Sequence, residues 1–262
     1  MVVATGASSR YFRALANLVG SIHHWAPGTT IAVFDLGLAP AERERIGGWC
    51  DCRLHWAPDG PPRNVLLDGR RLRRPHLAIP GLYAWKPLAI RQAVDEYRRV
   101  LWLDAGSDAR GPLDPIERAL ETDGHFLARG QDLDMTERLH PGCARRMGRT
   151  VADFAGRPSY AANTQGYERG AEADSRILDP MLAAALDRRT IAPIGATVLG
   201  HRFDQSLLSI IAYTSGLAIR DRTDLVAAHR HEVELDPRRA SARRIYTARA
   251  TSSDYTLCLR SR

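Results

Sequence analysis

The first half of the chain alternates between short apolar runs and longer segments whose apolar residues recur at helical spacing. The apolar, β-branched runs predict strands at 1–7, 31–37, 50–56 and 98–106. The periodic segments predict helices at 9–25, from Pro40 to 49, and at 86–97, with Pro87 in the first turn of the last, where proline is tolerated. This alternation predicts an α/β fold with a mostly parallel central sheet flanked by helices.

The second half of the chain is less regular. Its patterns predict a strand at 125–130, a helix near 175–189 and a strong helix at 203–216. Residues 57–82 and 130–165 show no clear period and are predicted to be loops, which could act as lids that order over a bound ligand. The Arg-rich sequence after about residue 222 predicts no element.

The formal net charge of +7 over 262 residues raises the possibility of a nucleic-acid partner. That class is disfavoured, because the arginines are scattered rather than interleaved with aromatic residues that could stack on bases. Lys86 is the only lysine, so 36 of the 37 basic residues are arginine, a bias typical of a GC-rich bacterial genome. No apolar stretch approaches the ~20 residues of a membrane span and no signal peptide is evident, so a cytoplasmic protein is expected.

Asp104 carries the first candidate chemistry. It follows the apolar run 100–103 and precedes the small residues Ala105 and Gly106. Ligands of parallel sheets bind outside the carboxyl ends of the strands, and Mg²⁺ or Mn²⁺ prefers oxygen ligands that it can share with phosphates. The alternative is that Asp104 only caps the turn after the strand.

Two segments, YFRALANLVGSIHHWAPGTTIAVFDLGL (11–38) and YAWKPLAIRQAVDEYRRVLWLDAGSD (83–108), resemble the nucleotide-diphospho-sugar transferases of the GT-A fold. The resemblance spans roughly residues 1–116 and resumes at 163–212. It implies a glycosyltransferase that moves a hexose or related sugar from a nucleotide-diphospho-sugar donor to an acceptor hydroxyl. It also implies a single GT-A-like (Rossmann-like) domain over 1–262, with a nucleotide-binding half (1–116), an acceptor-side half (117–222) and a C-terminal tail (223–262).

The resemblance assigns a divalent metal, Mn²⁺ or Mg²⁺, to an Asp-x-Asp motif. Asp104 matches the first acid, whereas the second falls on Gly106, which departs from the pattern. Asp108, or His229 or His231 of the tail, could supply the missing ligand. For the two histidines the alternative is an exposed pair in a polar tail.

Lys86 is expected at or just before a helix N-terminus, where a compact positive charge could face a phosphate; the alternative is a chance surface lysine. Asp204 is expected to cap the helix that follows it. The resemblance adds that Asp204 could be the general base that takes the proton of the acceptor hydroxyl, with Gln205 beside it at the donor.

The other predicted donor contacts lie at strand ends or in the polar loop: Thr5, Gly6 and Ala7 for the base or ribose, Asp35 for the nucleoside, and Asn163 and Gln165 for sugar hydroxyls. Two competing interpretations are a catalytically degenerate GT-A-like binding or scaffold domain, which Gly106 favours, and a basic nucleic-acid-binding protein, which only the charge favours. Retention of Asp104, Lys86 and the Asp204–Gln205 pair favours the transferase.

Overall fold

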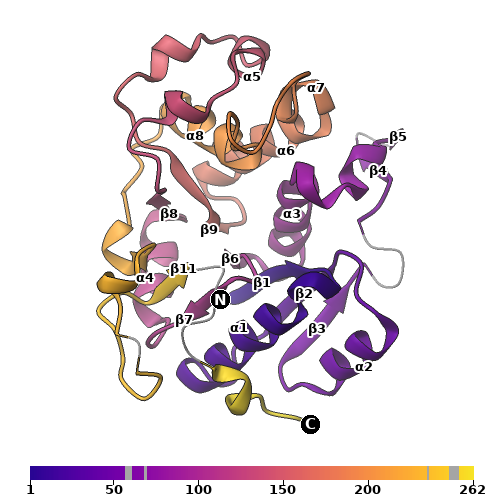
Figure 1. The fold of residues 1–262 in the computed structure, drawn as a ribbon, viewed down its shortest axis with the longest axis vertical. Helices are drawn as coiled ribbons and strands as arrows, with labels where there is room; N and C mark the ends of the chain where they lie inside the picture. Colours follow the sequence, from indigo (N-terminus) through magenta and orange to yellow (C-terminus); the bar gives the residue numbers. More distant parts are fainter. Residues whose placement is uncertain (57–60, 68–69, 235, 248–253) are drawn as a thin grey trace.

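The computed structural model describes residues 1–56, 61–67, 70–234, 236–247 and 254–262 (Figure 1). A six-stranded sheet in the order β3-β2-β1-β6-β9-β8 forms its centre. Its strands are β1 (Val2–Ala7), β2 (Ile31–Asp35), β3 (Cys52–His55), β6 (Arg99–Leu103), β8 (His125–Arg129) and β9 (Tyr160–Glu168). Strands β3, β2, β1 and β6 are parallel, and β9 runs antiparallel to both of its neighbours, β6 and β8, so the predicted mostly parallel sheet is confirmed.

Helices cover both faces of the sheet. Alternate residues of β1 point to opposite sides: Val3 packs with apolar residues of α1 (Phe12–Trp25), and Ala4 with those of α3 (Trp85–Tyr97). The other helices are α2 (Pro40–Gly48), α4 (Asp114–Asp123), α5 (Pro141–Arg146), η6 (Asp174–Leu178), α6 (Asp179–Leu186), α7 (Arg188–Ile191) and α8 (Asp204–Thr214). Short 3₁₀ turns are η1 (Ser9–Tyr11), η2 (Pro75–Ala78), η3 (Pro80–Leu82), η4 (Met135–Arg138), η5 (Val151–Phe154), η7 (Thr223–Leu225), η8 (Arg230–Glu232) and η9 (Tyr255–Cys258).

Three regions differ from the elements predicted from sequence. The predicted loop 57–82 contains a hairpin of β4 (Asn64–Leu67) and β5 (Arg70–Arg73), while residues 57–60 and 68–69 lie outside the described residues. The predicted loop 130–165 contains α5 and the first part of β9, which pairs with both β6 and β8. The predicted helix near 175–189 is divided among η6, α6 and α7.

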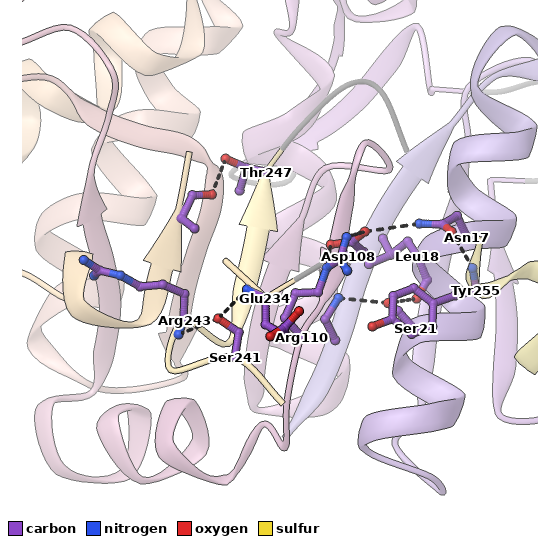
Figure 2. Close-up of polar contacts among 12 residues, drawn as sticks. Asn17, Leu18, Ser21, Asp108, Arg110, Glu234, Ser241, Arg243, Thr247 and Tyr255 are labelled. Atoms are coloured by element: carbon purple, nitrogen blue, oxygen red, sulfur yellow. Dashed lines mark hydrogen bonds and ion pairs between the residues drawn. The ribbon is translucent and has the colours of Figure 1, made fainter. Parts of the chain in front are cut away.

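The C-terminal tail is also structured where it is described. A small sheet joins β10 (Val226–Ala227) and β11 (Ile245–Thr247) to β7 (Ser107–Ala109), and η9 packs on α1. Figure 2 shows the link: Asn17 of α1 accepts a hydrogen bond from the backbone N–H of Tyr255 at 2.8 Å. The approach is so close that a Cβ at Gly20 would lie 2.0 Å from the backbone oxygen of Tyr255. Residues 235 and 248–253 of the predicted tail lie outside the described residues.

None of the helices within the described ranges is both long and apolar enough to cross a membrane.

Candidate active site

Lys86 is a buried cation that joins two carboxylates from different parts of the chain. It lies in the first turn of α3 and is 2% exposed. Its Nζ is 2.9 Å from Oδ1 of Asp104, at the end of β6, and 2.7 Å from Oδ2 of Asp204, at the start of α8. The backbone oxygen of Ala162 in β9 is 3.5 Å from the same nitrogen. The alternative of a chance surface lysine is therefore wrong, and the lysine ties α3, β6, β9 and α8 together.

The three groups determine each other's protonation. Burial by itself lowers the pKa of Lys86, but Asp104 and Asp204 outweigh burial and raise that pKa above its ordinary value. Burial raises the pKa of Asp204, and the charge of Asp104 adds to that effect while Lys86 opposes it. At neutral pH the cluster therefore holds a charged lysine, and Asp204 is a stronger base than an exposed aspartate.

Asp104 is the member of the cluster that faces outward, with its side chain 35% exposed. Its Oδ1 accepts a hydrogen bond from the indole N–H of Trp102 at 2.8 Å, and its backbone oxygen accepts one from Ser107 that closes the turn after β6. The carboxylate is thus held by an indole on its own strand and by Lys86. The predicted alternative, in which Asp104 caps the turn with its side chain, is not what the contacts show, because the turn is closed by the backbone oxygen.

Backbone strain flanks the ion pair. Asp204 is the first residue of α8 rather than its N-cap; the cap is Phe203, whose φ is 46°. Tyr83, three residues before Lys86, has a φ of 55°, and its ring lies 6.1 Å from that of Phe203. Residues other than glycine rarely adopt a positive φ. Each such residue costs about 1–3 kcal/mol, and such residues are concentrated at functional sites. The expected capping role of Asp204 is therefore wrong, and its side chain serves Lys86 instead.

A second polar network lies on the other side of Asp204. Nε2 of Gln205 donates to Asp132 at 3.1 Å and to Ser159 at 2.9 Å. Arg202 binds the same carboxylate of Asp132 with two N–H groups, each at 3.1 Å. A Cβ at Gly130 would lie 2.6 Å from Oγ of Ser159, so glycine is needed for this close approach. Sequence reasoning missed Asp132, Ser159 and Arg202, because only the fold brings them to Gln205.

The predicted contacts at the ends of β1 and β2 pack or form hydrogen bonds within the fold, except for the hydroxyl of Thr5. Thr5 is fully buried, and its Oγ1 has no hydrogen-bond partner among the described residues. Gly6 leaves room for aromatic packing, because a Cβ there would lie 3.3 Å from Trp85. The oxygens of Asp35 accept hydrogen bonds from the backbone N–H groups of Gly37 and Leu38, both at 2.7 Å, and from Nε of Arg43 at 2.6 Å. Ala7 accepts a backbone bond from Leu36.

The two predicted sugar contacts on β9 differ in their surroundings. Gln165 is fully buried and bonded to the Ala162 oxygen and the Tyr167 hydroxyl, both at 2.9 Å. Asn163 lies beside Asp104, whose backbone N–H donates to its backbone oxygen at 2.9 Å. The buried Oδ1 of Asn163 has no partner within the described part of the chain. Of the pair, Asn163 is the one with an unused polar atom next to the cluster.

The residues predicted to hold a metal are not brought together. Both oxygens of Asp108 bind Arg110, at 2.9 Å each, and Asn17 donates to one of them at 3.4 Å (Figure 2). Burial raises the pKa of Asp108, against the opposing effect of Arg110. His229 and His231 are exposed and stack on each other with ring centroids 5.6 Å apart.

No three His, Cys, Asp or Glu side chains converge on one point within the described residues. Gly106 offers no side-chain ligand, and the ammonium of Lys86 already lies 2.9 Å and 3.1 Å from the two oxygens of Asp104. A cation of the chain itself thus stands where a divalent ion would bind Asp104. The described donor set does not fit a divalent metal held by the protein.

No protein-family model matches the sequence, and no curated protein matches it significantly. In structure, the chain is similar to the apo form of WbbM, a bifunctional glycosyltransferase, with a TM-score of 0.57 and 10% identity over 98% of this chain and 48% of that one. The chain therefore spans about half the length of that enzyme. It is also similar to the apo form of mouse xyloside xylosyltransferase 1, with a TM-score of 0.52 and 11% identity over 96% of this chain and 98% of that one. The chain has the GT-A fold of nucleotide-sugar transferases.

Proposed function

We propose that the chain is a glycosyltransferase that moves a hexose or related sugar from a nucleotide-diphospho-sugar to an acceptor hydroxyl. The observation that carries the proposal is the buried Lys86 bound to Asp104 and Asp204 at the carboxyl end of β6. In an α/β sheet this edge is where ligands bind. The GT-A fold supports a nucleotide-sugar as that ligand, and the cytoplasmic bacterial location expected from the sequence stays a prediction.

In the proposed reaction the leaving diphosphate takes the place of the outward-facing Asp104 carboxylate at Lys86, whose ammonium then supplies the positive charge that the leaving group needs. Breaking the bond between the sugar and the diphosphate places negative charge on the departing phosphate oxygens, and a fixed cation in a dry site stabilises that charge. The two carboxylates keep Lys86 charged and fix its position, while Asp104 is the exposed end of the cluster. No step in this scheme requires a divalent ion.

Asp204 is proposed as the general base, and a positioning role toward Lys86 is the competing assignment. Its raised pKa favours proton transfer, whereas its ion pair with Lys86 at 2.7 Å favours positioning. The Asp204→Asn variant separates the two. Loss of a base lowers kcat by about 10²–10⁴-fold and removes the acidic limb of the pH–rate profile. Loss of positioning instead raises the dissociation constant of the donor nucleotide.

The first test is thermal unfolding with UDP, GDP, CDP or dTDP, each with Mn²⁺ and with EDTA. One nucleotide is expected to raise Tm by about 5–10 °C at a hundred times its Kd, with or without EDTA, and by at least as much in Asp104→Ala, which removes a negative charge beside the diphosphate. The matching nucleotide-sugars are then assayed for release of the nucleoside diphosphate. Stabilisation that requires Mn²⁺ would reject the lysine scheme, and no stabilisation by any nucleotide would reject the donor site.

A catalytically degenerate GT-A-like binding domain is the second candidate. It is favoured by Gly106 and by the three contacts that Lys86 already makes, with Asp104, Asp204 and Ala162. A degenerate domain would bind one of the four nucleotides and release no diphosphate from its sugar conjugate, even at high protein concentration.

A further inference from the structure

The segment between α7 and α8 carries apolar side chains on the outside of the molecule. Ile194, Val198 and Leu199 are 93%, 62% and 80% exposed. Leu133 is 85% exposed and follows Asp132, whose carboxylate binds Arg202 at the end of the same segment. Exposed apolar side chains that are clustered rather than scattered mark an interaction surface.

The backbone that carries these side chains is fixed. At its start, Pro193 touches the first turn of α5, where a Cβ at Gly142 would lie 3.0 Å from that of Pro193. At its end, the buried ring of His201 donates from Nε2 to the Ile191 oxygen at 3.0 Å and packs edge-on against His140. The apolar side chains therefore lie on segment 193–200, whose two ends are held together by the His201–Ile191 hydrogen bond and packed against α5.

The surroundings of the 193–200 segment are basic. Residues 138–149 contain four arginines and residues 188–202 contain three, with Glu137 and Asp187 at their borders. Three of the seven pair with carboxylates: Arg138 and Arg202 with Asp132, and Arg146 with Asp187. Arg146 of α5 binds Asp187 at the start of α7, so the two stretches lie side by side. Arg145, Arg188 and Arg189 are exposed, and none forms an ion pair within the described ranges. Figure 1 shows α5 and α7 at the end of the molecule opposite the C-terminus.

We propose that this end of the molecule, the 193–200 segment with its flanking arginines, docks on an anionic lipid bilayer. Exposed aliphatic side chains insert at the headgroup–acyl boundary, and arginines above them pair with anionic headgroups. A polyanion such as nucleic acid would use the arginines and gain nothing from Ile194 or Leu199. The apolar and basic groups occur together, which is the combination that an anionic bilayer recognises.

Docking would also restrict the acceptor, a consequence that rests on the proposed function. The segment leads through Arg202 and Phe203 directly into Asp204. An acceptor carried by a membrane lipid would thus meet the protein at the same end as the second polar network. Vesicle binding is measured without nucleotide, so failure of docking and failure of the transferase proposal are distinguishable.

The test is co-sedimentation with vesicles of phosphatidylcholine alone or mixed with phosphatidylglycerol. Wild type is expected to bind only the anionic vesicles. Ile194→Ser with Leu199→Ser should weaken binding by about tenfold or more. Arg188→Ala with Arg189→Ala should weaken it by about 30-fold.

The matched controls are Leu257→Ser, since Leu257 is 89% exposed on η9 far from this end, and Arg118→Ala with Arg238→Ala. Both controls should bind as wild type, and circular dichroism should show all variants folded. Equal binding to both vesicle types, no binding, or equal loss in the controls would overturn the proposal. The proposal is also overturned if only the arginine double variant weakens vesicle binding, as expected for a polyanion-binding surface. It is likewise overturned if the apolar double variant abolishes self-association of the protein and leaves vesicle binding unchanged.

Discussion

Replacing Lys86 with methionine removes the charge of the central cluster and keeps most of its volume. Asp204, with 7% of its side chain exposed, would then be a buried carboxylate without a counter-charge. Removing one partner of a buried ion pair typically costs about 3–5 kcal/mol, because the other charge stays desolvated. Asp104 contributes less to this loss, since its side chain is 35% exposed to water. Lys86→Met is therefore expected to lose about 3–5 kcal/mol of unfolding free energy at neutral pH.

The double variant Lys86→Met with Asp204→Asn tests the cause. It replaces the buried charge by a neutral amide, so most of the lost stability should return. The pH dependence gives a second check. In Lys86→Met the pKa of Asp204 is raised in the folded state, so the folded protein binds more protons than the unfolded chain. Stability of this variant should therefore rise as pH falls through the raised pKa of Asp204 toward the ordinary aspartate pKa of about 3.9.

Urea unfolding followed by circular dichroism measures these free energies. Arg98→Met is the matched control, because Arg98 ends the same helix, is 69% exposed and pairs with Glu168 at the surface, where a pair is worth at most about 1 kcal/mol. The electrostatic account is refuted if Lys86→Met loses no more than Arg98→Met. It is also refuted if the double variant is no more stable than the single one, or if the loss is independent of pH.

Three further outcomes are expected. Gly20→Ala should lose about 1–3 kcal/mol of unfolding free energy in urea, since its Cβ would lie 2.0 Å from the backbone oxygen of Tyr255. Gly47→Ala on α2, with nothing within 4 Å, is the control and should be neutral or slightly stabilising; equal effects of the two substitutions would contradict the close packing at Gly20. Burial lowers the pKa of His201 to about 4, so the folded state binds fewer protons than the unfolded chain. Stability is therefore lost as pH falls from about 6.5 to about 4, by up to about 3 kcal/mol. In His201→Gln the unfolding free energy should fall less steeply over this pH range. Asp104→Asn should change stability by less than about 1 kcal/mol and strengthen nucleotide binding in calorimetry, because it removes a negative charge beside the diphosphate, whereas unchanged binding would separate Asp104 from the donor site.

Hydrophobic periodicity was sufficient for the parallel part of the sheet but not for β9. The strands β1, β2 and β6 are nearly continuous apolar runs, as buried parallel strands usually are. β9 reads YAANTQGYE, a polar pattern that predicts a loop. It is nevertheless buried, because Gln165 satisfies its amide with the Ala162 oxygen and the Tyr167 hydroxyl. Such internal compensation depends on side-chain geometry that periodicity does not contain.

The candidate site was predictable one residue at a time but not as a cluster. Asp104 and Lys86 stood out through a strand end and through the single lysine, and both lie in the cluster. Asp108 stood out by spacing alone, yet both of its oxygens are bound by Arg110, two residues further along the chain. Asp132 gave no signal in a polar loop, because its partner Arg202 is 70 residues away. Long-range pairing of charges follows from topology, which the sequence pattern specified only in part.

The geometry also accounts for the retention of one lysine in a chain that uses arginine elsewhere. An ammonium has three hydrogen-bond donors on a compact head, and Lys86 meets three acceptors that belong to three different elements: Asp104, Asp204 and the Ala162 oxygen. A guanidinium is planar and larger, and it pairs best with one carboxylate through two parallel N–H groups, as Arg110 does with Asp108. Arg99 shows that a guanidinium can join two carboxylates where there is room, since it pairs with both Glu121 and Glu168. Position 86 is 2% exposed, and the larger guanidinium would have to displace its packed neighbours there. The compact ammonium fits this enclosed position, with Nζ 2.9 Å from Asp104 and 2.7 Å from Asp204.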